Sequence, residues 1–335
     1  MALRKRKTKF EIVSVGSAVR DVVFYTDASC IVPNPDSDPT KERLLCFEFG
    51  AKIRSSDVRF GFGGGAANSS INFVGLGFRA AALVSVSDDF DGRAIEQQLR
   101  SRGVSSSLIH VSKKHRTGLS FLVVDKATSE HTAYVYYGCA ADLDFSLPEL
   151  KRNPTEWYYV SAVPSPGWKG LFTHLIETDS KIAWNPGGKQ LKAGYKGLRT
   201  FLKRTSILIV NKDEAAELTM SHPDCDRPGT IKQMLKRIQS WGPEVVLITN
   251  SQKGSTAYDG QNYYHRDSPH DSPVDTTGAG DCFGSSFTAG IIRYKGDIAR
   301  AMELAQKNAT SVVHSVGAQN GFITWDKLPK NLRKV

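Results

Sequence analysis

The sequence predicts an α/β fold with a mostly parallel central sheet and a small β-sheet lid. From residue 157 onwards β-rich and helical segments alternate, which is typical of βαβ units and a parallel sheet. Residues 27–60, by contrast, contain several prolines and no helical periodicity, and they are too long for a bare loop in a compact domain. A second β-rich region, residues 119–138, reads as a hairpin around Ala127–Glu130. We expect these two regions to form the lid.

Composition is that of an ordinary globular protein. The 335 residues are 40% hydrophobic and 23% charged, enough for one large core or two small ones. No apolar run reaches the roughly 18 residues that a membrane span needs, and the basic N-terminus lacks the apolar stretch of a secretory signal. The five cysteines form no C-x-x-C pair, so we expect neither a disulfide framework nor a zinc site, and we expect a cytoplasmic protein.

The net charge of +10 is compatible with a nucleic-acid ligand. Apart from residues 4–9, however, the basic residues are dispersed along the chain. A basic enzyme that handles a nucleotide requires the same sign of charge. We therefore expect a small anionic ligand rather than nucleic acid.

The first half of the chain is expected to pass between core and lid. We assign residues 10–26 to the core with its first strand, 27–60 to a lid segment, 61–115 to the core and 116–140 to the lid hairpin; residues 141–325 complete the core and hold the nucleotide site. The strand Phe10–Ser17 is followed by Asp21. A carboxylate beyond the carboxyl end of a parallel strand suits a ligand site, although a simple turn is an equally ordinary role for it.

A glycine-rich segment, Gly61–Asn68, precedes the first predicted helix, which ends at Gly75 and Gly77. The spacing Gly61-x-Gly63-x-x-Ala66 imitates a dinucleotide fingerprint, and an NAD-dependent oxidoreductase is one alternative. The context is wrong for it, because no apolar strand precedes the glycines. The following segments predict a buried strand over 79–87 and a helix from Asp88 to Arg102.

The second half predicts strands over 157–163, 181–184, 206–210 and 244–250, with helices near 167–178, 190–203, 213–220 and 299–314. A hairpin follows across Asp259-Gly260. Between strand and helix, Asn211-Lys-Asp-Glu214 is spaced as a capping box, which is one interpretation of this pair; a ligand role is the other.

The stretch Val274–Asp281 predicts an anion site that carries its own acid. Gly278, Ala279 and Gly280 leave backbone N–H groups uncovered, and the apolar residues that follow at intervals of four indicate a helix. A helix start attracts anions through its free N–H groups and its dipole. Asp281 lies in the first turn, where it is either a stabilising helix residue or a general base for an alcohol that attacks a phosphoryl group.

The run Asp275-Thr-Thr-Gly-Ala-Gly-Asp281, followed by Cys-Phe-Gly, resembles the C-terminal signature of the ribokinase-like (PfkB) family of carbohydrate and nucleoside kinases. The resemblance implies a three-layer sandwich with a β lid. It also implies an anion hole made by Gly278, Ala279 and Gly280, with Asp281 as catalytic base. Gly63, Gly64 and Asn68 match the N-terminal Gly-Gly-x-x-x-Asn signature. Together with Asp21 they are implied to bind the acceptor.

Further positions carry implied roles. Asn211, Thr249, Gly254 and Asn308 would contact ATP, Glu214 would hold Mg²⁺ through water, and Asp275 and Thr277 would bind a monovalent cation, K⁺. The implied reaction transfers the γ-phosphoryl to a sugar hydroxyl, and the implied assembly is a homodimer through the lids.

The acceptor stays open, because these motifs describe the phosphate. A nucleoside or a sugar phosphate is the alternative, and a sugar phosphate would need a basic partner such as Arg20, Lys41, Arg43 or Arg116. A catalytically silent sugar- or nucleotide-binding regulator is an alternative of a different class.

Overall fold

The computed structural model describes residues 9–35, 43–128, 131–269 and 274–334. In these ranges the main sheet has nine strands in the order β15-β14-β13-β12-β11-β10-β1-β6-β7. All neighbours are parallel except β13–β14 and β14–β15. The strands are β1 (Phe10–Val15), β6 (Ala80–Ser87), β7 (Ile109–Ser112), β10 (Thr155–Val160), β11 (Lys181–Trp184), β12 (Ile207–Asn211), β13 (Val245–Thr249), β14 (Ser255–Tyr258) and β15 (Tyr263–Arg266).

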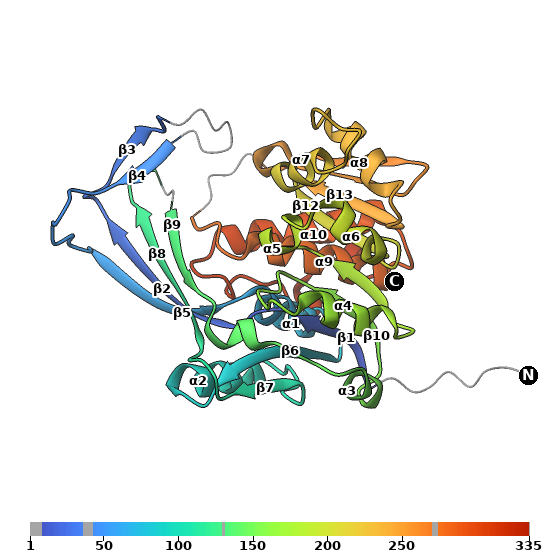
Figure 1. Cartoon of the computed structure of the whole chain (residues 1–335), viewed down its shortest axis with the longest axis horizontal. Helices are drawn as coiled ribbons and strands as arrows, with labels where there is room; N and C mark the ends of the chain where they lie inside the picture. The colour runs from blue at the N-terminus through green and yellow to red at the C-terminus, as the bar shows by residue number, and fades with distance from the viewer. Residues whose placement is uncertain (1–8, 36–42, 129–130, 270–273, 335) are drawn as a thin grey trace, which may run out of the picture.

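Alternate residues of the central strands enter two separate cores. On β10, Tyr158 packs in the core on one face of the sheet and Tyr159 in the core on the other. One face is covered by α1 (Gly65–Gly75), α9 (Ala279–Arg293) and α10 (Ile298–Val313), and the opposite face by α4 (Trp168–Ile176), α6 (Gly194–Leu202), α7 (Lys212–Met220) and α8 (Ile231–Gln239). The predicted three layers, a mostly parallel sheet between two sets of helices, are confirmed (Figure 1).

The remaining elements of the core are α2 (Phe90–Ser101), α3 (Leu147–Arg152), α5 (Gly188–Leu191), α11 (Lys330–Arg333) and the 3₁₀ turns η1 (Gly138–Asp142), η2 (Ser251–Lys253) and η3 (Trp325–Lys327). The elements that were not predicted from the sequence are α3, α8, α11, the three 3₁₀ turns and the edge strand β7. Within the described ranges, no helix combines the length and apolar character that crossing a bilayer requires.

The lid is a separate four-stranded sheet in the order β5-β2-β8-β9, with a two-stranded ribbon, β3–β4, beside it. Its strands are β2 (Val19–Thr26), β5 (Asp57–Gly63), β8 (Gly118–Asp125), β9 (His131–Tyr136), β3 (Cys30–Pro33) and β4 (Arg43–Cys46). Figure 1 shows these strands projecting from one side of the core. The predicted hairpin is β8–β9, and part of its expected turn, residues 129–130, lies outside the described residues.

One assignment differs from expectation. We expected residues 10–26 to belong to the core, yet β2 pairs with β5 and β8 in the lid along its whole length. The chain leaves the core directly after β1, at Gly16, whose φ of 152° accompanies close packing against Ser161. Asp21 is therefore a residue of the lid, and it reaches the core from there.

A glycine inside α9 makes room for a buried tyrosine. A Cβ on Gly284 would lie 2.5 Å from the hydroxyl of Tyr159, a fully buried residue of β10. We predict that Gly284→Ala lowers the free energy of unfolding by about 1–3 kcal/mol, as overpacking does, measured by urea denaturation. The control is Gly170→Ala in α4, where a Cβ meets nothing within 4 Å. That variant is expected to gain roughly 0.5–1 kcal/mol from helix propensity; equal stabilities of the two variants would contradict the steric account.

Candidate active site

The start of α9 is built as the sequence predicted, with Gly278 in the left-handed conformation at the N-cap (φ 76°). A Cβ there would lie 2.6 Å from the carbonyl oxygen of Ala318, so the turn is pressed against the segment that follows α10. Asp275 joins the same two segments, because its carboxylate accepts from the N–H groups of Thr277 (2.8 Å) and Gly317 (2.9 Å). The helix start is thus held rigidly, and a Cβ on Gly280 would meet nothing within 4 Å.

Asp281 lies in the first turn of α9 and faces the glycine segment that opens α1. A Cβ on Gly65 would be 3.2 Å from its Oδ1, and its Oδ2 accepts a 2.8 Å hydrogen bond from Nδ2 of Asn68. Burial raises the pKa of Asp281, while the hydrogen bond from Asn68 opposes the rise. A raised carboxyl pKa brings the group closer to the range useful for proton transfer at neutral pH.

Asp21 approaches the same glycine segment from the lid. Its side chain is only 9% exposed, and a Cβ on Gly63 would lie 2.1 Å from its Oδ2. Burial raises the pKa of Asp21 to about 7, and the negative charge of Asp281 adds to the rise. Two carboxylates from distant parts of the chain therefore meet at Gly63–Gly65, where core and lid join.

Gly64 holds the turn between them. Its φ of 98° suits glycine, and a Cβ would lie 2.5 Å from the carbonyl oxygen of Ser17. Asn68 is 2% exposed, and its side chain is directed at Asp281. The resemblance implies that Asn68 binds the acceptor, and the structure shows that its amide nitrogen donates to the predicted base.

Gly63 is small because Asp21 occupies the place of a side chain. We predict that Gly63→Ala displaces the Asp21 carboxylate and raises KM for the acceptor by roughly ten-fold, about 1.4 kcal/mol of binding, with a smaller effect on KM for ATP. Steady-state kinetics with each substrate varied in turn measures both. Gly61→Ala, where a Cβ meets nothing within 4 Å on the same strand, is the matched control and should leave both values near those of the wild type.

The Asn211–Glu214 pair forms the predicted capping box at the start of α7. Oδ1 of Asn211 accepts from the N–H of Glu214 (2.8 Å), and the N–H of Asn211 donates to Oε2 of Glu214 (2.8 Å). Burial raises the pKa of Glu214. The cap employs one carboxylate oxygen of Glu214 and leaves Oε1 without a role in it. Across the described residues, no three histidine, cysteine or acidic side chains form a group that could hold a metal ion by themselves.

Thr249 and Gly254 bracket the turn after β13, at the carboxyl edge of the sheet beside the end of β12. Gly254 has a φ of 79°, and a Cβ there would lie 2.0 Å from the carbonyl oxygen of Arg266. Its conformation is required by close backbone packing. Both residues are located where ligands of open α/β sheets bind.

Asn308 is a correction to the sequence interpretation. It is completely buried, its Nδ2 donates to Asn72 (2.8 Å) and Ser286 (2.9 Å), and its Oδ1 accepts from the N–H of Ile323 (2.8 Å). Both amide hydrogens are therefore used inside the core between α1, α9 and α10. Asn308 joins helices and does not contact a nucleotide with this side chain.

Arg20, a candidate partner for a phosphate on the substrate, does not face the site that contains Asp21. Its guanidinium lies over the rings of Phe60 and Phe62 (5.3 and 4.7 Å to the centroids) and 3.7 Å from Asp91 of α2. Neighbouring residues of a strand point to opposite faces, so Arg20 and Asp21 face apart. Arg116 is exposed, whereas Lys41 and the side chain of Arg43 lie outside what the structure describes.

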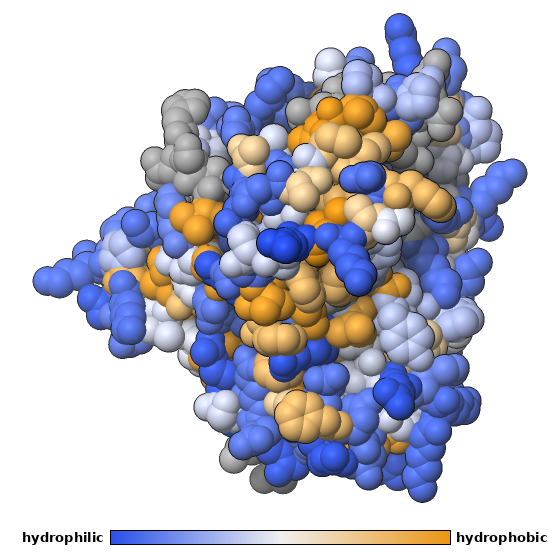
Figure 2. Space-filling model, turned by 90° about the vertical axis from the view of Figure 1, so that its left-hand side faces the viewer, coloured by the Kyte–Doolittle hydropathy of each residue, from blue (hydrophilic) through white to orange (hydrophobic). Residues whose placement is uncertain are grey.

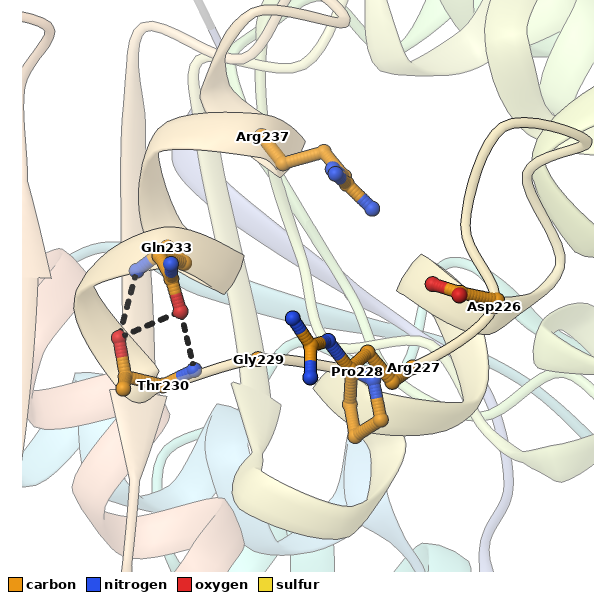
Figure 3. Close-up of a pocket in the computed structure, with 7 residues that line it drawn as sticks. All are labelled: Asp226, Arg227, Pro228, Gly229, Thr230, Gln233 and Arg237. Atoms are coloured by element: carbon orange, nitrogen blue, oxygen red, sulfur yellow. Dashed lines mark hydrogen bonds between the residues drawn. The ribbon is translucent and has the colours of Figure 1, made fainter.

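An open pocket lies at the start of α8 and contains none of the predicted site residues. Its rim includes the exposed Arg227 and Arg237. Figure 3 shows Gln233 turned back towards Thr230, whose N–H it accepts at 2.8 Å. The polar groups at this helix start satisfy one another, as in an ordinary capping box.

Comparison with known proteins identifies the family. The pattern of the pfkB family carbohydrate kinases matches residues 9–325. The chain is 23% identical to a nucleoside kinase from Methanocaldococcus jannaschii, over 97% of both chains. It is 27% identical to a 5-dehydro-2-deoxygluconokinase from Halalkalibacterium halodurans, over 81% of this chain and 85% of the relative.

Solved structures share the fold. The ribokinase of Arabidopsis thaliana, complexed with ribose and ATP, superimposes with a TM-score of 0.78 at 19% identity, covering 97% of this chain and 99% of that one. A nucleoside kinase from Burkholderia thailandensis in complex with inosine gives 0.76 at 16% identity, covering 96% and 97%. With the family pattern matched across almost the whole length, the chain belongs to the pfkB family of carbohydrate kinases and is a phosphotransferase with an alcohol group as acceptor.

Proposed function

We propose that this protein transfers the γ-phosphoryl of ATP to a hydroxyl of a free sugar, with Asp281 as general base. The observation that carries the proposal is the position of Asp281. Its carboxylate lies in the first turn of α9, directly behind the N-cap glycine and close to the Asp21 carboxylate. A helix start attracts the transferring phosphate, and a carboxylate beside it serves proton abstraction better than anion binding.

In the proposed reaction each group has one task. The N–H groups of Gly278, Ala279 and Gly280 stabilise the charge that develops on the phosphoryl oxygens. Asp21 accepts hydrogen bonds from the sugar and orients it. Asp281 takes the proton of the attacking hydroxyl through Oδ1, since Oδ2 is bonded to Asn68. Closure of the lid over these groups excludes water that would otherwise hydrolyse ATP.

The residues present suit Mg²⁺ and a monovalent cation. Magnesium in phosphoryl-transfer sites is bound by one or two carboxylates, waters and substrate phosphates, so it needs no protein cage. Glu214 has the oxygen to hold it through water, and the ion supplies charge neutralisation on the phosphates. Asp275 and Thr277 lie on a turn joined to Gly317, and carbonyl groups of these two segments are candidate ligands for K⁺.

A nucleoside is the second candidate acceptor. It is favoured by the similarity to a nucleoside kinase along 97% of both chains. A ribose hydroxyl of a nucleoside would meet Asp21 and Asp281 in the same way as a free sugar. The two candidate acceptors therefore differ only in what would surround the nucleobase. For a sugar phosphate, Arg20 is not an available partner, because it is engaged on the opposite face of the lid from Asp21. Free thiols at all five cysteines suit the reducing cytoplasm in which we place the enzyme.

We also propose that two copies associate through the outer faces of their lids. Residues that share the face of Arg20 are mostly apolar, and Phe60 and Tyr134 are 64% and 62% exposed. Figure 2, which views the molecule from the side on which the lid projects, shows apolar residues among polar ones. Phe60→Glu is expected to shift the protein from dimer to monomer in sedimentation velocity, whereas Met220→Glu, at an exposed site at the end of α7, should not. Monomeric wild-type protein at assay concentration would contradict this assembly.

The test of the proposed function is ATP consumption with Mg²⁺, with and without K⁺, against a panel of acceptors. The panel contains ribose, fructose, fructose 6-phosphate, 2-keto-3-deoxygluconate, adenosine, cytidine and inosine. Turnover with a free sugar supports the proposal, and turnover with a nucleoside alone replaces it with the second candidate. Binding of ATP without turnover on any acceptor would instead favour a silent binding protein.

A further inference from the structure

A line of side-chain amides runs from the surface helix α2 to the predicted base, and Gln319 and Asn68 within it are buried. Nε2 of Gln98 donates to Oε1 of Gln319 (2.6 Å), and Nε2 of Gln319 donates to Oδ1 of Asn68 (3.0 Å). Nδ2 of Asn68 then donates to Oδ2 of Asp281 (2.8 Å). The four residues come from α2, the segment after α10, α1 and α9, so the line connects parts of the chain that are distant in sequence.

The carboxylate fixes the direction of the whole line. An ionised Asp281 can only accept, so Asn68 must present its NH₂ group to it. Oδ1 of Asn68 then faces Gln319 and requires a donor, which turns the NH₂ group of Gln319 towards it. By the same reasoning Oε1 of Gln319 receives the NH₂ group of Gln98. Each amide is held in one of its two orientations by the next.

Gln319 is the residue that connects Asn68 to the outer part of this line of hydrogen bonds. It is 5% exposed, and its backbone carbonyl accepts from the guanidinium of Arg102 (3.0 Å). Asn68 is 2% exposed. In such a low-dielectric setting hydrogen bonds are strong and a reversed amide, with oxygen facing oxygen, is costly. Gln319 thereby reinforces the orientation of Asn68 that the Asp281 carboxylate requires.

We propose that Gln319 is a positioning residue of the kinase, one that orients Asn68 so that Oδ2 of Asp281 is occupied and Oδ1 takes the proton. This rests on the proposed role of Asp281 as base. The geometry agrees with it, because Oδ1 faces Gly65, which has no side chain to block access. The hydrogen bond from Asn68 also lowers the pKa of Asp281 against the effect of burial, which keeps a larger share of the base ionised.

The test compares Gln319→Met with Gln190→Met. Methionine keeps the length of the side chain and removes its hydrogen bonds. Gln190 is the matched control, since it is fully buried on the other face of the sheet and donates to the carbonyl of Val163 (2.6 Å). The readouts are kcat, KM for ATP, the pH profile of kcat and the urea midpoint.

For Gln319→Met we expect kcat to fall by roughly ten- to a hundred-fold, as for a slightly misplaced catalytic group, with KM for ATP unchanged. The acidic limb of the kcat profile should move to higher pH, because Asp281 loses an oriented donor. Gln190→Met should lower the urea midpoint and leave the pH profile in place. A purely structural role for Gln319 predicts that the two variants behave alike, and that result would overturn the proposal.

Two further variants keep the test decisive. Gln98→Met breaks only the outermost link at a half-buried position, and should produce a smaller shift of the acidic limb in the same direction. Gln319→Glu has the shape of the native residue but offers acceptors only, so Asn68 must reverse and kcat should fall below that of Gln319→Met. If Gln319→Met does not fold, an unshifted limb in Gln98→Met together with full activity in Gln319→Glu overturns the inference.

The proposed function fails in a different way. If wild-type protein phosphorylates no acceptor, or if Asp281→Asn remains active, the assignment of the base is wrong. If wild type is active, Asp281→Asn is inactive and Gln319→Met matches the wild type in kcat and pH profile, only the role of Gln319 is wrong.

Discussion

Replacing Asp281 by asparagine is expected to lower kcat by about 10²–10⁴-fold, the range that general acid–base catalysis contributes. Asparagine has the same shape, and its carbonyl oxygen can still accept from Asn68, but it cannot take a proton from the attacking hydroxyl. The proposed anion site at Gly278–Gly280 consists of backbone N–H groups and should be unaffected. Affinity for ATP should therefore stay within a few-fold of the wild type, measured by calorimetric titration, while kcat is measured at saturating substrates.

The matched control for Asp281 is Asp297, which begins the neighbouring helix α10. Its carboxylate caps that helix by accepting from the N–H of Arg300 (3.0 Å). Asp297→Asn should alter stability by less than about 1 kcal/mol, because asparagine is also a good N-cap, and should leave kcat unchanged. A loss of kcat below ten-fold in Asp281→Asn would mean that another group receives the proton.

The core could be predicted from sequence because its signals are local. Strands such as β12 and β13 are continuous apolar runs, which is typical of strands buried on both faces, and the helices between them are amphipathic. The helix α8 was not predicted, although Ile231, Met234, Leu235 and Ile238 recur at helical spacing and the signal for it is local.

The path of β2 could not be predicted from local sequence patterns. Val19–Thr26 has the composition of any strand, and only its pairing with β5 and β8 assigns it to the lid. Those partners lie many residues away, and the chain turns between β1 and β2 within three residues. A local reading continues the first strand where the structure begins a second sheet.

The same distinction between local and long-range signals applies to the site. The motif around Asp281 was recognisable, since a glycine turn and a following helix are written in adjacent residues. Asn308 was misassigned because its partners, Asn72 and Ser286, come from other helices and remove it from the surface. The hydrogen bonds of Gln319 could not be predicted for the same reason. They join Gln319 to residues that lie 221 and 251 positions away in the chain.

Substitution of Asp21 by asparagine is expected to move activity and stability in opposite directions. Loss of a charged hydrogen bond to the acceptor, worth about 1.5–3 kcal/mol, should raise KM for the acceptor by roughly ten- to a hundred-fold. Stability should increase at pH 8. The pKa of Asp21 is raised from 3.8 to about 7 in the folded protein, so folding binds this proton more tightly than the unfolded chain does.

The sign of the pH dependence follows from that difference. The favourable contribution of the protonated Asp21 is fully present below pH 3.8 and is lost as the pH rises through 7, where a buried charge must be maintained. Asparagine has no charge to bury, so the variant should exceed the wild type in urea midpoint at pH 8, and the difference should shrink towards pH 4.

Asp89→Asn is the opposite case. Burial works against its charge, yet hydrogen bonds from Thr117 and Gly92 hold the pKa of Asp89 below its ordinary value. The Asp89→Asn variant should be less stable than the wild type at pH 8. A gain in stability in both variants, or in neither, would contradict the assignment of Asp21 as a buried carboxylate that destabilises the folded protein and serves to bind the ligand.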